Sequence, residues 1–187
     1  MTVPDEDTWL VLHEIRLRGV LDPASDVARS LGGSAGNHAE TLVAAGYVVA
    51  AARGWRCTAE GRAAHATWAR LDVGGEAEGA VSRLMVRFDD VNREVIATCH
   101  AWQENPGDWS VLDRLTAVHD RAVPILTRTT RAHPRFARYE PALATAIDRV
   151  TAGDPVWVAS PRCDSYHTVW MRLHEDLLLA LGRERGA

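Results

Sequence analysis

The side chains best suited to bind a ligand or move a proton gather in the C-terminal half of the chain. Three of them, His167, Trp170 and His174, share one helical face at spacing i, i+3, i+7. A pocket inside a helical bundle uses aromatic side chains as walls and a few polar groups to orient the ligand. The sequence therefore predicts a site for a small organic effector, lined by Asn92, Trp102, Gln103, His119, His167, Trp170 and His174.

The same side chains leave other interpretations open. A metal site would take His119, His167 and His174 with an acid such as Asp176, but the closely spaced His–carboxylate pair of di-metal bundles is missing, so no metal or other cofactor is expected. An acid–base role in catalysis is a further alternative. These residues can also belong to the core or to an interface. No nucleotide-binding glycine loop or nucleophile motif accompanies them, which favours a binding protein over an enzyme.

Another group of polar residues precedes residue 57 and could contact DNA. If a helix over 34–45 enters the major groove, Asn37 could pair with adenine, and Ser34 or Thr41 could touch a phosphate. Glu40 would repel a phosphate, and this helix carries no arginine, so the electrostatic contribution to affinity would be small. The predicted DNA contacts are Ser34, Asn37, His38, Thr41, Arg53 and Arg56, the two arginines coming from a β-hairpin.

The local pattern of the N-terminal part predicts the elements that would present these residues. Apolar periodicity and turn residues predict helices over 8–20, 23–31, 34–45 and 58–71, and short strands over 47–50 and 55–57. Ser34 is a candidate N-cap of the third helix, and Gly46 is placed to end it. Helix, helix, turn, helix, hairpin, helix is the order of a winged helix-turn-helix, which we assign to residues 1–73.

Three stretches of this part, DVARSLG, ETLVAAGYV and GWRCTAEGR, resemble the winged-helix core of MarR-type bacterial transcriptional regulators. The matching positions are Leu42, Gly46, Tyr47, Val48, Thr58, Gly61 and Arg62, while Cys57 stands where the family has leucine. The resemblance covers residues 8–71 and implies a winged helix whose third helix and wing contact DNA. Because two half-sites supply affinity that one weakly basic module lacks, a homodimer is expected.

The remainder of the chain is predicted to be almost wholly helical. An acidic, glycine-rich stretch at 72–79 is typical of a linker. Residues 80–104 then carry a near-heptad apolar seam made of Val81, Leu84, Met85, Phe88, Val91, Val95, Cys99 and Trp102. Further helices are predicted over 109–130 with Pro124 inside, over 135–152, and from Asp164 or Ser165 to about Arg183. The expected fold is mainly α with a small β-hairpin wing, its antiparallel bundle spanning 80–187.

Composition bounds the remaining possibilities. The 187 residues carry a formal net charge of −4, and all 21 basic residues are arginine, so a nucleic-acid surface would have to be local. Three widely spaced cysteines argue against a disulfide scaffold and for a reducing compartment. No apolar run reaches the roughly 20 residues of a membrane span, and the acidic N-terminus lacks the apolar core of a signal peptide. A cytoplasmic protein without a membrane partner is expected.

Two hypotheses follow from these patterns. The first is a ligand-responsive, DNA-binding transcriptional regulator, in which the winged helix reads DNA while the bundle binds a small effector and dimerises. The second is a protein that does not bind DNA, in which the winged helix is a packing or docking module. Its bundle would then carry a small-molecule binding or enzymatic site, or dock on a partner enzyme.

Overall fold

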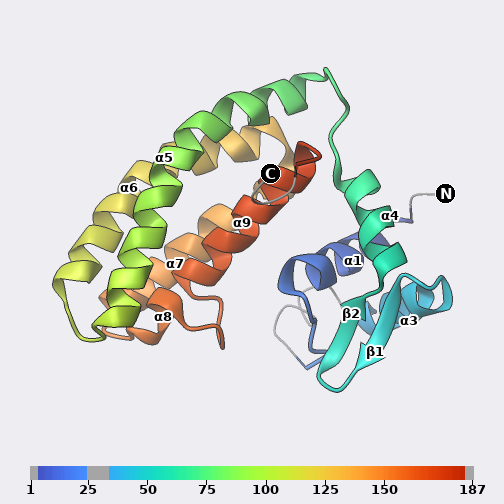
Figure 1. Ribbon diagram of the computed structural model, residues 1–187, viewed down its shortest axis with the longest axis horizontal. Helices are drawn as coiled ribbons and strands as arrows, with labels where there is room; N and C mark the ends of the chain where they lie inside the picture. Colours follow the sequence, from blue (N-terminus) through green and yellow to red (C-terminus); the bar gives the residue numbers. More distant parts are fainter. Residues whose placement is uncertain (1–3, 25–33, 184–187) are drawn as a thin grey trace. The chain divides into compact units, whose positions relative to one another are not determined.

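The computed structural model describes residues 4–24 and 34–183, and the chain divides into two compact units (Figure 1). Of the described residues, one unit contains 4–24, 34–70 and 182–183, and the other spans Leu71–Leu181. The fold is mainly α with one small antiparallel β-hairpin, which confirms the predicted fold class. Among the described residues, no helix combines the length and apolar character needed to cross a membrane.

The elements follow one another in nearly the predicted order. They are α1 (Glu6–Arg18), α3 (Ala35–Ala44), β1 (Val48–Ala51), β2 (Gly54–Cys57), α4 (Ala59–Ala69), α5 (Glu76–Glu104), α6 (Ser110–Ala132), the 3-10 turn η1 (Pro134–Phe136), α7 (Tyr139–Thr151), α8 (Val156–Ala159) and α9 (Tyr166–Ala180). The second helix predicted over 23–31 falls mostly outside the described residues and stays a prediction.

The first unit packs α1, α3 and the hairpin around a small apolar core. Helix α1 begins two residues before the predicted start because Asp5 caps it, its carboxylate accepting a hydrogen bond from the Thr8 backbone N–H at 3.0 Å. Strand β2 also pairs with Leu21, whose backbone exchanges hydrogen bonds of 2.9 and 3.0 Å with Trp55. The core consists of Val11, Leu12, Ile15, Leu21, Ala35, Ala39, Leu42, Val48 and Cys57.

The motif that joins the hairpin to α4 has a direct steric explanation. The Thr58 hydroxyl caps α4 by accepting from the Gly61 N–H at 2.9 Å, and it donates to the Gly46 carbonyl at 2.8 Å. A Cβ added at Gly61 would lie 1.9 Å from the Tyr47 carbonyl oxygen, so only glycine fits there. Gly46 ends α3 with a φ of +77°, as predicted from its position.

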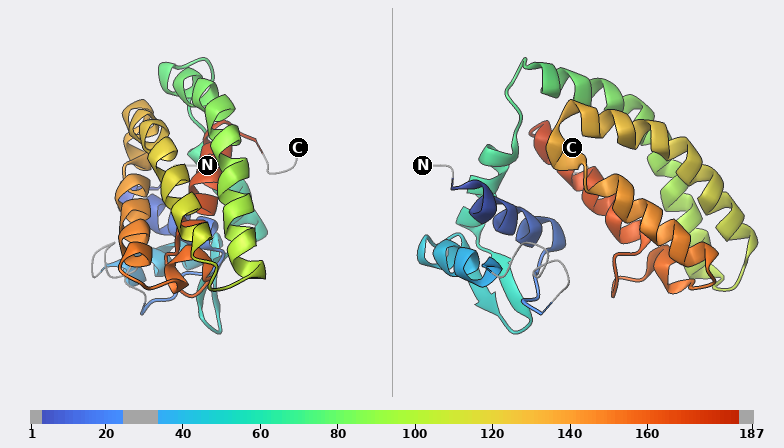
Figure 2. Two further views of the ribbon diagram at one scale, coloured as in Figure 1. Left: turned by 90° about the vertical axis from the view of Figure 1, so that its left-hand side faces the viewer. Right: turned by 180° about the vertical axis from the view of Figure 1, so that it is seen from behind.

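The second unit is a bundle in which α5 and α6 run side by side in opposite directions, with α7 and α9 packed on them (Figure 2). The α5 seam is buried as predicted, except that Leu84 is only half-buried. The buried core of the unit includes Val81, Phe88, Val95, Cys99, Leu115, Ala122, Leu126, Phe136, Leu143, Ala146, Tyr166, Trp170, Leu173 and Leu177.

Several predicted boundaries are wrong by a few residues. Helix α5 begins at Glu76, so residues 76–79 are helical and not part of a linker. The helix expected from residue 135 is split into η1 and α7. Ser165 caps α9 as one of the two predicted candidates, but the helix ends at Ala180. Ser34 makes no side-chain cap to any described residue, because its backbone is already helical there, with φ −95° and ψ −1°.

Candidate functional site

Helix α3 has one buried face and one face of polar and small residues exposed on the first unit. Ala35, Ala39 and Leu42 are buried against the core. Asn37 and Thr41 lie on the opposite side and are exposed, and the Thr41 hydroxyl donates to the Asn37 carbonyl at 3.0 Å. Two of the predicted DNA contacts therefore lie one helical turn apart on a solvent-facing stripe.

His38, a third predicted DNA contact, faces α1 instead. Its Nδ1 lies 2.8 Å from the Thr8 hydroxyl, and that hydroxyl lies 2.8 Å from the Asp5 carboxylate. Because the carboxylate can only accept, the Thr8 hydroxyl donates to Asp5. His38 then donates to Thr8, so the hydrogen of its ring lies on Nδ1. The Thr8 backbone hydrogen bond is the main cause that lowers the pKa of Asp5. His38 is half-buried and has a structural partner that the sequence did not indicate.

The hairpin supplies the positive charge of this surface. Arg53 lies in the turn between β1 and β2, and Arg56 is on β2 opposite Val49; both arginines are exposed. Gly54 fixes the turn, since its φ is +130° and a Cβ there would lie 2.1 Å from the Leu21 carbonyl oxygen. Glu40 is also exposed on α3 and adds a negative charge to the exposed residues of the first unit.

In the bundle, the predicted effector residues Asn92 and Trp170 contact each other directly. The Trp170 indole N–H donates to the Asn92 side-chain oxygen at 2.9 Å, and both residues are buried. The indole also stacks on Phe88, with ring centres 4.9 Å apart and planes at 6°, and on Tyr166 at 6.2 Å. Two residues of the predicted ligand site, one as an orienting group and one as a wall, are thus hydrogen-bonded to each other.

His119 joins the same interior cluster through Tyr166. Its Nδ1 lies 3.3 Å from the Tyr166 hydroxyl, and the two rings meet edge to face. Burial lowers the pKa of His119 and raises the pKa of Tyr166, because a charged form of either would lose its hydration. Both groups are therefore neutral near pH 7 and serve as hydrogen-bonding members of the core.

The other predicted effector residues are spread around this cluster. His174 tilts against Phe88 with ring centres 5.2 Å apart, and His167 is half-buried on the same helix. Trp102 is buried near the end of α5, whereas Gln103 beside it is exposed. The bundle brings the centre of the predicted set together, with Asn92, Trp170 and His119 in contact with one another or with Tyr166 and Phe88.

Asp176, the acid considered for a metal site, is fully buried in a different set of contacts. Its carboxylate accepts from the Tyr139 hydroxyl at 2.9 Å and from Arg135, and Arg138 lies 3.7 Å away. Burial, reinforced by the Asp176 charge, raises the pKa of Tyr139. In the chain from 4 to 24 and 34 to 183, no three His, Cys, Asp or Glu side chains are placed to hold a metal ion.

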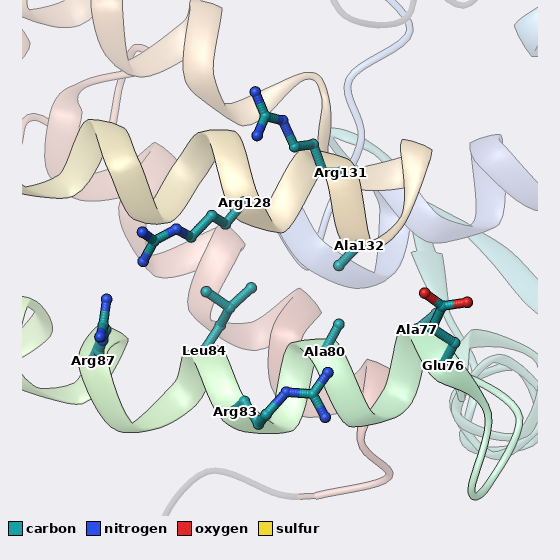
Figure 3. Close-up of a pocket in the computed structure, with 9 residues that line it drawn as sticks. All are labelled: Glu76, Ala77, Ala80, Arg83, Leu84, Arg87, Arg128, Arg131 and Ala132. Atoms are coloured by element: carbon teal, nitrogen blue, oxygen red, sulfur yellow. The ribbon is translucent and has the colours of Figure 1, made fainter.

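A groove that the sequence did not indicate lies between the first half of α5 and the last half of α6 (Figure 3). It is open to solvent and has a volume of about 760 Å³. Its described lining consists of Glu76, Ala77, Ala80, Arg83, Leu84, Arg87, Arg128, Arg131 and Ala132. The signal that could have found it is the spacing of the arginines, four apart on one helix and three apart on the other.

Comparison of the chain with known protein families, curated proteins and solved structures found no match.

Proposed function

We propose that the protein is a ligand-responsive, DNA-binding transcriptional regulator. The observation that carries this proposal is the solvent-facing stripe of α3, where Asn37 and Thr41 lie opposite a fully apolar buried face. A helix held on its scaffold by one face and polar on the other suits entry into a major groove. In this assignment Asn37 reads an adenine edge and Thr41 contacts a phosphate.

The hairpin supports the same assignment. Arg53 and Arg56 are the exposed cations of its turn and second strand, in the position of a wing that would lie along the DNA backbone. Two arginines give a small electrostatic contribution, so a homodimer that binds two half-sites is part of the proposal. The bundle would bind the effector and supply the dimer contacts.

DNA binding is tested with the full-length protein and fluorescent duplexes from its own upstream region at low salt. The double variant Arg53→Ala/Arg56→Ala should weaken binding and reduce the slope of log affinity against log salt by about 2. Asn37→Ala should relax sequence preference at one base pair and lose about 1–3 kcal/mol. Arg114→Ala is the matched control, because Arg114 is an exposed arginine of α6 that belongs neither to the predicted DNA contacts nor to the predicted effector site.

The proposal fails if the protein at micromolar concentration shifts none of these duplexes, with or without small-molecule extracts of the source cells. It also fails if Arg114→Ala weakens binding as much as the hairpin variant does. In either case the second candidate, a winged-helix unit that docks on protein, becomes the better one. Glu40 supports that candidate, because this exposed carboxylate on α3 would repel a DNA phosphate.

A further inference from the structure

The groove between α5 and α6 concentrates positive charge that the fold does not neutralise. Arg83 and Arg87 come from α5, and Arg128 and Arg131 from α6. All four side chains are exposed, and none makes an ion pair with any residue in 4–24 or 34–183. Glu76, at one end, is the single acid among the described residues that line the groove.

The same helix pair shows what a neutralised position looks like. Farther along, Glu94 of α5 and Arg121 of α6 form an ion pair, and the hydrogen bond from Arg121 lowers the pKa of Glu94. Arg87 lies seven residues before Glu94, and Arg128 lies seven residues after Arg121, so in antiparallel helices they occupy the equivalent facing positions one heptad away. Arg87 therefore occupies the position where an acid would be needed to pair with Arg128.

Two of the four side chains are oriented toward the gap between the helices, whereas Arg131 extends away from it. Figure 3 shows Arg87 and Arg128 extending toward one another across the gap between the helices. Arg83 lies back along α5, with one guanidinium nitrogen 3.2 Å from where a Cβ of Gly79 would be. Like charges held across a gap repel each other, and an anion bound between them removes that repulsion. The fold does not require arginines at these two positions, whereas an anion bound between them would use both.

The lining also indicates what kind of anion would fit. Guanidinium groups present paired N–H donors that match the oxygens of phosphate and carboxylate groups. Leu84, Ala80 and Ala132 add an apolar surface beside the arginines. The groove, with a volume of about 760 Å³, leaves room for a small molecule. A duplex would need cations along a ridge, whereas Arg87 and Arg128 face each other across a gap.

From these contacts we infer that the α5–α6 groove binds a small organic anion with at least two negative charges, a phosphate ester or a polycarboxylate, clamped between Arg87 and Arg128. The inference names the chemical class of the effector and therefore rests on the effector-binding part of the proposed function. It does not depend on DNA binding, because the anion can bind without DNA.

The test is isothermal titration of the full-length protein without DNA, using sodium pyrophosphate and sodium citrate as probes against sodium chloride of equal ionic strength. We expect saturable binding of at least one probe and none of chloride. Binding of pyrophosphate alone would assign the ligand to the phosphate esters, and binding of citrate alone would assign it to the polycarboxylates. Binding of both would show that the arginines recognise the negatively charged oxygens common to the two classes. Loss of two charge-assisted contacts in Arg87→Ala/Arg128→Ala should weaken binding by about 100-fold.

Arg87→Glu gives a second variant that should keep the fold, because the new carboxylate can pair with Arg128 as Glu94 pairs with Arg121. It should abolish binding, with an unchanged circular dichroism spectrum. Arg114→Ala should bind like the wild type. Absence of saturable binding by both probes, or wild-type binding by Arg87→Glu, overturns the inference. So does binding of an acidic peptide alone, which would make the groove a protein-docking surface. None of these outcomes bears on DNA binding by the first unit.

Discussion

The bundle contains two sets of arginines in opposite situations. Arg135 and Arg138 share the buried carboxylate of Asp176, and their guanidinium groups lie over the rings of Phe136 and Tyr139 at 5.0 and 4.9 Å. Arg87 and Arg128 of the groove are exposed and extend toward each other (Figure 3). Arginine thus has two roles in the bundle. Arg135 and Arg138 connect the η1–α7 segment to α9, whereas Arg87 and Arg128 remain available to a ligand.

The difference teaches which charges hold the fold and which do not. A buried arginine is tolerated only with its acid, so removing the acid is costly. An exposed arginine without a partner contributes little to stability, so removing it costs little. The following predictions test this contrast, beginning with the largest expected effect.

Asp176→Ala should give the greatest loss of stability. It leaves Arg135 buried without its carboxylate, so the free energy of unfolding should fall by about 3–5 kcal/mol. Urea unfolding followed by circular dichroism measures it. The matched control is Glu94→Ala, which removes the exposed partner of Arg121 and should cost about 0–1 kcal/mol. Equal losses in the two variants would contradict the contrast.

Asn92→Ala should have the next largest effect. It leaves the buried Trp170 indole N–H without its acceptor, and the expected loss is about 1–3 kcal/mol in the same measurement. Gln103→Ala removes an exposed amide from the same helix and should stay within about 0.5 kcal/mol of the wild type. If Gln103→Ala were the more damaging variant, the interior cluster would not be the part that stabilises the bundle.

Acid should destabilise the protein through His119 and His133. Burial is the main cause that lowers the pKa of both His119 and His133 below the 6.5 of an unfolded histidine. As the pH falls below about 6.5, the unfolded chain therefore binds protons first, and stability is lost until the pH reaches the native pKa values. The free energy of unfolding, measured from about pH 8 to about pH 5, should fall over this window.

His119→Gln should make that decline shallower, because it removes one of the two histidines whose pKa burial lowers. His100→Gln, at an exposed position on α5, serves as the control and should keep the wild-type slope. A wild-type slope in His119→Gln would show that His119 does not contribute to the acid sensitivity.

Arg87→Glu should have the smallest effect on stability and the opposite sign. The new pair with Arg128 replaces a repulsion with an attraction, so the free energy of unfolding should rise by about 0.2–1 kcal/mol without ligand. Arg87→Gln removes the repulsion without adding a pair and should gain less. A clear loss of stability in Arg87→Glu would mean that Arg87 has a structural role.

Features set by near neighbours in the chain were predictable from the sequence. Thr58 and Gly61 indicate the start of α4. Thr58 caps the helix, and Gly61 leaves room for the Tyr47 carbonyl. The α5 seam was equally visible in its heptad spacing. Boundaries such as Glu76 were missed, because acidic and glycine residues at 74–79 are as typical of a helix start as of a linker.

The candidate sites were harder to predict, because they depend on which residues face one another. Nothing near His38 in the sequence reveals that Thr8 of another helix is its partner. Several predicted effector residues meet in the bundle, where the Trp170 indole N–H donates to the Asn92 oxygen. A list of polar and aromatic residues at core positions cannot distinguish a pocket from a packed cluster, since both use the same residue types.

By itself, the sequence determined the mainly α fold, the hairpin and the apolar faces of the helices, because periodicity and turn chemistry act over a few residues. Only the tertiary structure decided which polar groups are paired and which are not. Arg87 and Arg128 are 41 residues apart in the sequence, and their facing positions depend on the register of α5 against α6. That register is set by side-chain packing across the two helices, which no single stretch of the chain contains.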